Sequence, residues 1–185
     1  MDKVEAAFTA VPRENFVPEY LKSHSTIDSA LPIGHGQTIS QPTTVRLMLM
    51  WLSPQAGDKV LDLGSGSGWT SALLSKMVGD EGRVYAVEKI PELLQMGMSN
   101  CQNLGIKNIS FHLAGDEYGL PSEAPFNRIL VSAAAEELPQ SLLKQLAPGG
   151  KMVIPVESDI IEIEKDGESY RKITHRGFAF VPLVA

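Results

Sequence analysis

The sequence has a single cysteine, Cys101, so no disulfide can form within the chain. It also lacks the basic start and apolar stretch of a secretory signal peptide. No segment approaches the ~20 apolar residues of a membrane-spanning helix. These absences predict a cytoplasmic protein in a reducing compartment, with no membrane partner.

Positive charge is in the minority, because 16 Lys and Arg residues stand against 22 Asp and Glu, for a net charge of −6. Proteins that bind nucleic acid need a basic surface, so a nucleic-acid partner is not expected. The 185 residues are 43% hydrophobic and contain no repeat or long linker. One domain over residues 1–185 is therefore predicted, with a monomer as the default assembly.

The sequence does contain a glycine-rich segment, Val60–Trp69, in which a predicted apolar strand is followed directly by a turn. Its alternating glycines are Gly64, Gly66 and Gly68. Such a turn lets a ligand approach the backbone closely. The dinucleotide fingerprint needs a further glycine three residues after the second one, but Trp69 and Ser71 occupy the two possible positions. Nicotinamide and flavin dinucleotides are therefore disfavoured.

Acidic residues lie at or just after the ends of three predicted strands, at Asp62, Glu88 and Asp116. A carboxylate at Asp62 would repel a pyrophosphate but attract an ammonium group, which S-adenosylmethionine carries. Glu88 can accept both ribose hydroxyls, and Asp116 can accept from the adenine amine. Each acid alone fits a helix cap, but three in order favour this cofactor. For Asp62, ordering the glycine loop through backbone hydrogen bonds is an equally weighted role.

Strand and helix patterns alternate after Gly57, which predicts an α/β fold with a mostly parallel, doubly wound sheet. Strands are expected at 59–63, 83–87, 109–113, 128–132, 152–156, 160–164 and 177–181. Helices are expected from about 69, from Pro91, and over 139–146, ending at Pro148-Gly149-Gly150. An Asp-Gly pair at 166–167 indicates a hairpin, so antiparallel strands should extend the sheet at its C-terminal end.

Residues 1–56 precede the core of residues 57–185 and are expected to be helical at both ends with an irregular middle. The middle contains Leu31–Pro42, which is typical of a lid over a cofactor and precedes a helix from Thr43 to Leu52. Three side chains with donor groups lie just before that helix, namely Gln37, Thr38 and Ser40. An anion such as an acceptor carboxylate fits this position. Composition alone slightly favours an ordinary loop before a capped helix.

Four segments occur together in the order of one family: Val11–Pro18, Leu31–Pro42, Val60–Trp69 and Gly149–Pro155. With them the chain resembles the protein-L-isoaspartate O-methyltransferases over nearly its whole length, and Gly36–Ser40 is the most specific match. The resemblance implies a class I S-adenosylmethionine-dependent methyltransferase fold, which is Rossmann-like, with an N-terminal helical lid. It also implies an enzyme that methylates the α-carboxyl group of L-isoaspartyl residues, after which succinimide formation on the ester permits repair.

The residues and the resemblance together give an acceptor set and a cofactor set. Within them, the resemblance matches Thr38, Ile39 and Ser40 and the cofactor contacts Gly64, Ser65, Gly66, Ser67, Glu88 and Asp116. The acceptor set is Gln37, Thr38, Ile39 and Ser40, with Ser40 as the proposed catalytic serine. The cofactor set, for S-adenosylmethionine and its product S-adenosylhomocysteine, is Asp62, Gly64, Ser65, Gly66, Ser67, Glu88, Lys89, Asp116 and Glu117. The expected partners are damaged proteins or peptides. No metal is expected, because His24, His112 and His175 show no ligand spacing.

The sequence also departs from the residues usual in that family. Thr26 replaces tyrosine, Ala30 and Glu136 replace proline, Asn127 replaces aspartate, and Glu117 stands where an Asp-Gly pair is usual. These departures motivate two alternatives: a carboxyl methyltransferase for a dedicated aspartyl peptide partner, and a weakly catalytic S-adenosylmethionine-binding module. A nucleic-acid methyltransferase is a weaker third, because Ser132–Ala135 offers no aromatic stacking platform.

Overall fold

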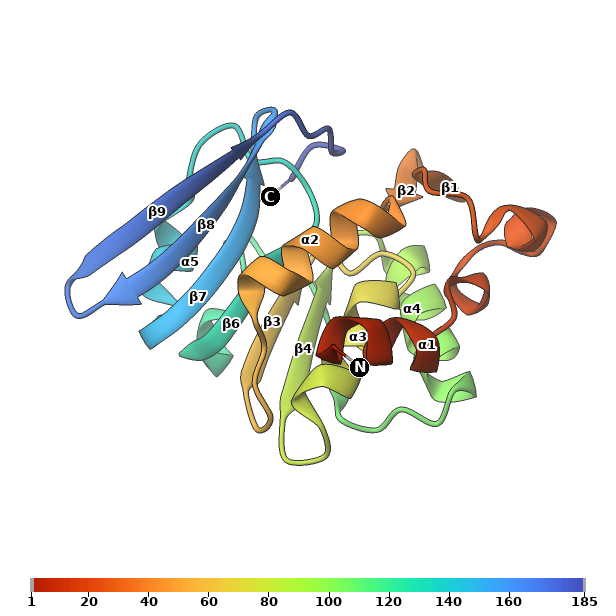
Figure 1. Cartoon of the computed structure of the whole chain (residues 1–185), viewed down its shortest axis with the longest axis horizontal. Helices are drawn as coiled ribbons and strands as arrows, with labels where there is room; N and C mark the ends of the chain where they lie inside the picture. Colours follow the sequence, from red (N-terminus) through yellow and green to blue (C-terminus); the bar gives the residue numbers. More distant parts are fainter. Residues whose placement is uncertain (1, 185) are drawn as a thin grey trace.

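The computed structural model describes residues 2–184 and is built around a seven-stranded sheet (Figure 1). Its strands are β3 (Lys59–Leu63), β4 (Arg83–Glu88), β5 (Ile109–Leu113), β6 (Phe126–Val131), β7 (Leu146–Val156), β8 (Asp159–Asp166) and β9 (Ser169–Arg176). They lie in the order β5-β4-β3-β6-β7-β8-β9. Neighbours from β5 to β7 are parallel, whereas β7, β8 and β9 pair antiparallel. The predicted α/β class and the antiparallel C-terminal strands are confirmed.

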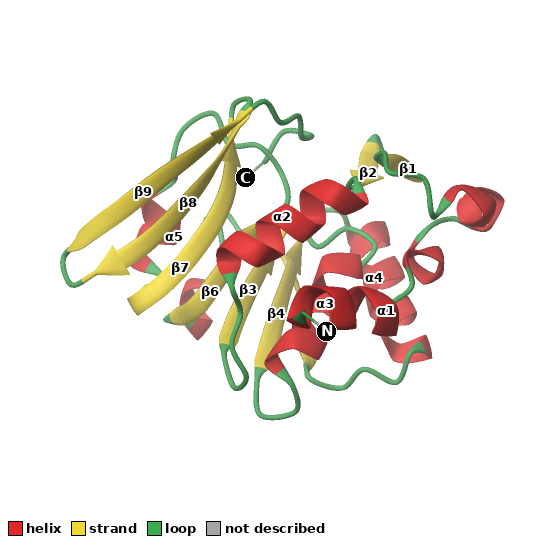
Figure 2. Ribbon diagram, in the orientation of Figure 1, coloured by secondary structure: helices red, strands yellow, loops and turns green. Residues whose placement is uncertain are grey.

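Helices cover both faces of the sheet (Figure 2). They are α1 (Lys3–Ala10), α2 (Pro42–Leu52), α3 (Trp69–Val78), α4 (Pro91–Asn103) and α5 (Gln140–Lys144), with 3₁₀ turns η1 (Arg13–Phe16), η2 (Glu19–His24) and η3 (Pro121–Glu123). Side chains alternate between faces along a strand. In β3, Val60 joins the core beneath α1 to α4, while Leu61 and Leu63 join the core beneath α5. The central strands are therefore apolar on both sides.

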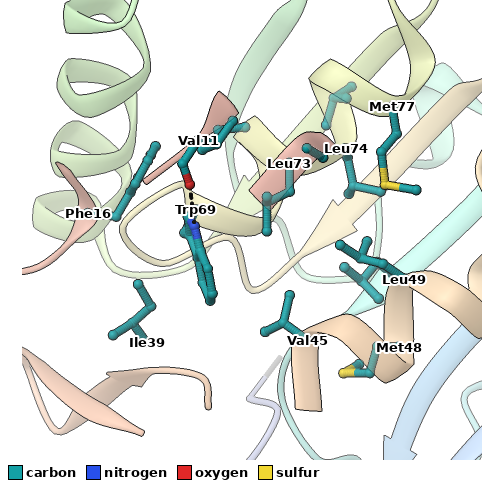
Figure 3. Close-up of a cluster of buried hydrophobic side chains, with 14 of the residues drawn as sticks. Val11, Phe16, Ile39, Val45, Met48, Leu49, Trp69, Leu73, Leu74 and Met77 are labelled. Carbon is teal, nitrogen blue, oxygen red and sulfur yellow. Dashed lines mark hydrogen bonds between the residues drawn. The ribbon is translucent and has the colours of Figure 1, made fainter. Parts of the chain in front are cut away.

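The N-terminal segment packs into the same core as α3. Residues 2–56 are helical at both ends, as predicted, and their middle contains a hairpin of β1 (Leu31–Gly34) and β2 (Gln37–Ile39). Figure 3 shows the junction, where the Trp69 indole N–H donates to the Val11 carbonyl at 3.2 Å. Leu49 of α2 is fully buried in this cluster. The segment that carries the acceptor motif is therefore anchored to the first residue of α3.

The C-terminal part differs from the sequence prediction in three places. Residues 177–181 are not a strand, and β9 precedes them. Phe178 and Phe180 instead pack against the core beneath the helices, and the Ala134 N–H donates to the Val181 carbonyl at 2.8 Å, which draws the segment across the end of β6. Pro148-Gly149-Gly150, expected to mark the end of a helix, instead lies inside β7 where its pairing with β6 shifts register. The predicted helix over 139–146 shortens to α5.

None of the helices in residues 2–184 has both the length and the apolar character needed to cross a membrane.

Candidate active site

A cavity lies at the C-terminal ends of the parallel strands, where open α/β sheets bind ligands. Its walls come from the ends of β3, β4 and β6, from the residue after β5, from the β1–β2 hairpin and from residues 181–184. The lining includes Ile33, Gln37, Thr38, Leu63, Gly64, Gly66, Val87, Glu88, Lys89, Ile90, Leu93, Ala114, Ser132, Ala133 and Val181. This mixture of apolar side chains with a few polar groups is typical of a small-molecule site.

The glycine loop between β3 and α3 forms the floor of this cavity. Gly64 and Gly66 have φ values of 81° and 52°, which side chains with a Cβ rarely adopt. A Cβ on Gly66 would lie 3.2 Å from the Ile33 Cδ1 atom, so the hairpin sits directly over the loop. A Cβ on Gly68 would lie 3.0 Å from the Gly97 Cα atom of α4. The close helix approach that the dinucleotide fingerprint obtains from its third glycine comes here from Gly97.

Asp62, near the end of β3, is fully buried behind the loop. Its Oδ2 atom accepts hydrogen bonds from the Thr70 hydroxyl at 2.8 Å and from the Ser71 hydroxyl at 2.5 Å, so it holds the first turn of α3. Its Oδ1 atom has no hydrogen-bond partner among residues 2–184. Burial raises the pKa of Asp62 to about 6, although the two hydroxyl contacts oppose this shift. A contact between Asp62 and a ligand ammonium group stays a prediction.

Glu88, at the end of β4, faces the cavity and is 8% exposed. Its Oε2 atom accepts from the Gly66 N–H at 2.8 Å, and its Oε1 atom accepts from the N–H groups of Lys89 and Ile90 at 2.9 and 3.0 Å. Hydrogen bonds to an ionised acceptor are roughly twice as strong as neutral ones. The carboxylate is therefore fixed in the cavity wall and tied to the glycine loop.

The other predicted cofactor residues divide into two groups. Ser65 and Ser67 are buried in the loop, and Lys89 lines the cavity beside Glu88. Asp116 and Glu117 are exposed after β5 and lie outside the cavity lining, to which Ala114 is the contribution from that region. The structure thus brings Glu88, Lys89 and the loop to one cavity, whereas Asp116 and Glu117 follow the lining residue Ala114 by two and three residues.

A second groove adjoins the first cavity and contains two of the four predicted acceptor residues, Thr38 and Ser40. Its lining includes Ala30, Thr38, Ser40, Gln41, Thr43, Thr44, Ser132 and residues 177–181. Thr38, Ser132 and Val181 line both spaces. Gln37 lines the first cavity only. Ile39 is 5% exposed and packs into the core near Trp69 (Figure 3), so only its main chain is left to face a ligand.

Two residues near the acceptor segment received no role from the sequence, Arg13 and Asp28. Asp28 caps the N-terminus of α2, although it lies far from this helix in the sequence. Its Oδ1 atom accepts a hydrogen bond from the Thr43 N–H and its Oδ2 atom accepts one from the Thr43 hydroxyl, both at 2.8 Å. The Gln41 side chain adds a hydrogen bond of 3.1 Å, and these contacts lower the pKa of Asp28. A local capping motif cannot reveal this contact, because the acid lies fifteen residues before Thr43.

The departures from the usual family residues fall in different places. Ala30 lines the acceptor groove, whereas Thr26 lines a hollow beside Trp69 and Arg46. Glu136 is exposed outside both linings. The Asn127 side chain accepts from the Lys59 N–H at 2.8 Å, at the opposite end of β3 from the loop. Of these four, only Ala30 touches the groove.

No group of three or more His, Cys, Asp or Glu side chains within residues 2–184 is arranged to hold a metal ion.

Comparison with known proteins gives a consistent result. The family model described as protein-L-isoaspartate(D-aspartate) O-methyltransferase matches residues 1–185. A protein-L-isoaspartate O-methyltransferase from Methanopyrus kandleri is 47% identical over 190 residues, which cover 99% of this chain and 84% of the relative. Another from Pyrococcus horikoshii is 41% identical over 189 residues, which cover 99% of this chain and 85% of the relative.

Two solved structures share the whole fold. A protein-L-isoaspartate O-methyltransferase matches all of this chain with a TM-score of 0.91 at 27% identity, and this chain spans 62% of that protein. A Plasmodium falciparum protein assigned to the same activity, in complex with S-adenosyl-L-homocysteine, matches with a TM-score of 0.86 at 26% identity. The match covers all of this chain and 91% of the Plasmodium chain.

The burial of Asp62 predicts a pH-dependent stability. Its folded pKa of about 6 lies above the unfolded value of ~4, so its contribution to folding is complete below pH 4 and is lost as the pH rises through 6. We expect Asp62→Asn to gain about 2–3 kcal/mol in unfolding free energy, relative to the wild type, between pH 4 and 7. Urea unfolding across this range measures the difference. Asp80→Asn, at an exposed site, should run parallel to the wild type. A parallel curve for Asp62→Asn would contradict the prediction.

Proposed function

The chain belongs to the protein-L-isoaspartate(D-aspartate) O-methyltransferase family, and on this premise we propose that it methylates the α-carboxylate of L-isoaspartyl residues in damaged proteins and peptides. The methyl donor is S-adenosylmethionine. The observation that carries the proposal is the junction of the two spaces, which share Thr38, Ser132 and Val181. A donor in the first cavity and a carboxylate in the groove would meet at this shared wall.

The residues of the first cavity fit the donor. Glu88 offers acceptor oxygens for ribose hydroxyls, and Gly64 to Ser67 offer a backbone that a ligand can approach closely. The unpartnered Oδ1 atom of Asp62 provides negative charge behind the loop for an aminoacyl ammonium group. Lys89 belongs to the same wall. Asp116 and Glu117 are kept as adenine-side residues on the family resemblance alone.

The chemistry demands placement rather than proton transfer. S-adenosylmethionine supplies a methyl group on a positively charged sulfur, which a carboxylate oxygen can attack directly. An acceptor carboxylate, with a pKa of about 4, is already ionised at neutral pH and needs no general base. Holding the reacting groups in line can supply an effective molarity of about 10⁵–10⁸ M. The role of the chain is therefore to orient the carboxylate and to exclude water.

Ser40 is suited to orient that carboxylate. It lines the groove just before α2, where partial positive charge from the helix N-terminus favours an anion. Its hydroxyl can donate to one carboxylate oxygen, with Gln37 and Thr38 nearby on β2. In this role Ser40 does not remove a proton. The β1–β2 hairpin above the loop and residues 177–181 across the groove limit the access of water.

We further propose that residues 1–185 act as one domain, as a cytoplasmic monomer without nucleic acid, membrane or metal. The core shared by α1, α2 and α3 supports a single unit of residues 1–56 and 57–185. The net charge of −6 supports a protein or peptide acceptor rather than nucleic acid. Cys101 is buried, which raises the pKa of its thiol to about 12, as suits a packing role rather than a reactive one.

The primary test is transfer of labelled methyl to one peptide synthesised in isoaspartyl and ordinary aspartyl forms. We expect labelling of the isoaspartyl form only, as a base-labile ester. Preference for the aspartyl form would instead support a dedicated peptide partner. Ala30 favours this alternative, because it lines the groove and replaces the usual proline. Binding of S-adenosylhomocysteine without labelling of either form would contradict methyl transfer to these acceptors.

Removing the Ser40 hydroxyl should slow transfer without weakening donor binding. For Ser40→Ala we expect kcat/KM for the isoaspartyl peptide to fall about tenfold or more, because a hydrogen bond to a charged group contributes about 1.5–3 kcal/mol. The dissociation constant of S-adenosylhomocysteine should stay within about twofold. Ser23→Ala serves as the control, because the exposed Ser23 hydroxyl forms a hydrogen bond with its neighbour His24 and lines neither space. Unchanged turnover of Ser40→Ala would show that the hydroxyl does not orient the acceptor.

Neutralising Glu88 should weaken donor binding. Glu88→Gln keeps the size of the side chain. Its amide N–H₂ group, however, would face at least one of the three backbone N–H groups that donate hydrogen bonds to the carboxylate. We expect about a tenfold or greater rise in the dissociation constant of S-adenosylhomocysteine, measured by calorimetry. Glu92→Gln, at an exposed position in the first turn of α4, should bind like the wild type. Equal affinities for the two variants would remove Glu88 from the donor site.

A further inference from the structure

We propose that Arg13 is a positioning residue of the acceptor site, which fixes the main chain of Ile39 and Ser40 so that the next two N–H groups face the acceptor carboxylate. This inference rests on the proposed function. It concerns a residue that lines neither the first cavity nor the groove. Its action on the acceptor is therefore indirect, through the backbone.

The guanidinium of Arg13 is surrounded by main-chain carbonyl groups. The side chain is buried, with 6% of the residue exposed. Nη1 donates to the carbonyls of Ser25 and Ile27 at 3.1 and 3.2 Å, and Nη2 donates to those of Ser29, Ile39 and Ser40 at 2.8, 3.2 and 3.0 Å. The planar guanidinium carries several N–H donors in a fixed fork, so one side chain can hold separate segments in register. Arg13 thereby joins the loop of residues 25–29 to the end of β2.

The geometry of the peptide bond passes this restraint to the groove. In a trans peptide the C=O and the following N–H point to opposite sides. The only cis peptide within residues 2–184 is Ala124–Pro125, so the bonds after Ile39 and Ser40 are trans. With both carbonyls directed at Arg13, the N–H groups of Ser40 and Gln41 point away from it. Both residues line the groove and Arg13 does not, so these donors are turned to the acceptor side.

The two N–H groups are also free to bind an acceptor. Within the part of the chain that the structure describes, neither the Ser40 nor the Gln41 N–H donates a hydrogen bond. The Asp28 carboxylate takes the next available donor along the chain, the Thr43 N–H, since Pro42 has none. Two adjacent donors at the start of α2 therefore remain for an anion.

Arg13 is itself held in place by the glycine-loop side of the molecule. Its guanidinium lies 5.4 Å from the centre of the Trp69 ring, at cation–π distance. The Trp69 N–H is bound to the Val11 carbonyl, two residues before Arg13. Burial lowers the pKa of Arg13 to about 10, partly offset by Asp28, so the group stays charged at neutral pH. Arg13 thus fixes the position of the Ile39 and Ser40 main chain relative to Trp69, the residue that follows the glycine loop.

The test compares Arg13→Lys with Arg46→Lys. Lysine keeps the charge, but its compact ammonium group cannot hold five separate carbonyls. For Arg13→Lys we expect kcat with the isoaspartyl peptide to fall about 10–100-fold, with S-adenosylhomocysteine affinity within about twofold, because displacement of about 1 Å can cost 10²-fold in rate. Rates are expressed per site that binds S-adenosylhomocysteine, so loss of folded protein cannot produce the effect. Arg46, which pairs with Glu5 over the Phe8 ring, should tolerate lysine.

The outcomes separate this inference from the proposed function. An active wild type, with Arg13→Lys unchanged in kcat per binding site and in KM for the peptide, overturns the positioning role alone. A wild type that binds S-adenosylhomocysteine but labels no peptide overturns the proposed function, and the positioning role with it. If Arg13→Lys fails to bind S-adenosylhomocysteine, Arg13→Ala is measured with added methylguanidinium. Recovery of kcat per binding site supports the role, and no recovery overturns it.

Discussion

Two carboxylates at the ends of adjacent parallel strands hold the turn on which the rest of the site depends. Glu88 binds the Gly66 N–H from the cavity side, and Asp62 binds the Thr70 hydroxyl from the core side. Because the turn is fixed from both sides, the direction in which α3 leaves it is fixed as well. That direction places Trp69, and Trp69 anchors the N-terminal segment through Val11. The first cavity and the start of the segment that leads to the groove are thus positioned by one buried turn.

Arg13 connects Trp69 to the end of β2. Arg13 lies against the Trp69 ring and reaches the carbonyls of Ile39 and Ser40. Each of these contacts lies in the packed interior, where side chains occupy defined positions. A reaction that requires in-line placement, without proton transfer, benefits from a rigid connection between its two binding spaces. The fold therefore fixes the position of the groove relative to the first cavity, in addition to enclosing the substrates.

The sequence predicted the core strands and helix starts well where local signals specify them. Apolar runs marked β3 and β5, and Pro91 marked the start of α4. The strand prediction over residues 177–181 was wrong, because the alternating apolar side chains of this segment cover the core and the groove and do not join a sheet. The strand that does form, β9, was missed because it is an exposed edge strand without a continuous apolar face. The contacts of Arg13 span 12 to 27 residues, beyond the reach of any local pattern.

Burial of Asp62 has consequences for both stability and ligand choice. Its Oδ1 atom lacks a partner among the described residues, and desolvation is the main cause of its raised pKa. Above pH 6 the folded chain therefore carries a buried negative charge that its own hydroxyl contacts compensate only in part. A positive group bound beyond the loop would favour the ionised form and so lower that pKa. The same carboxylate that destabilises the free protein thus favours a cationic ligand. The aminoacyl ammonium and sulfonium groups of the proposed donor both carry positive charge.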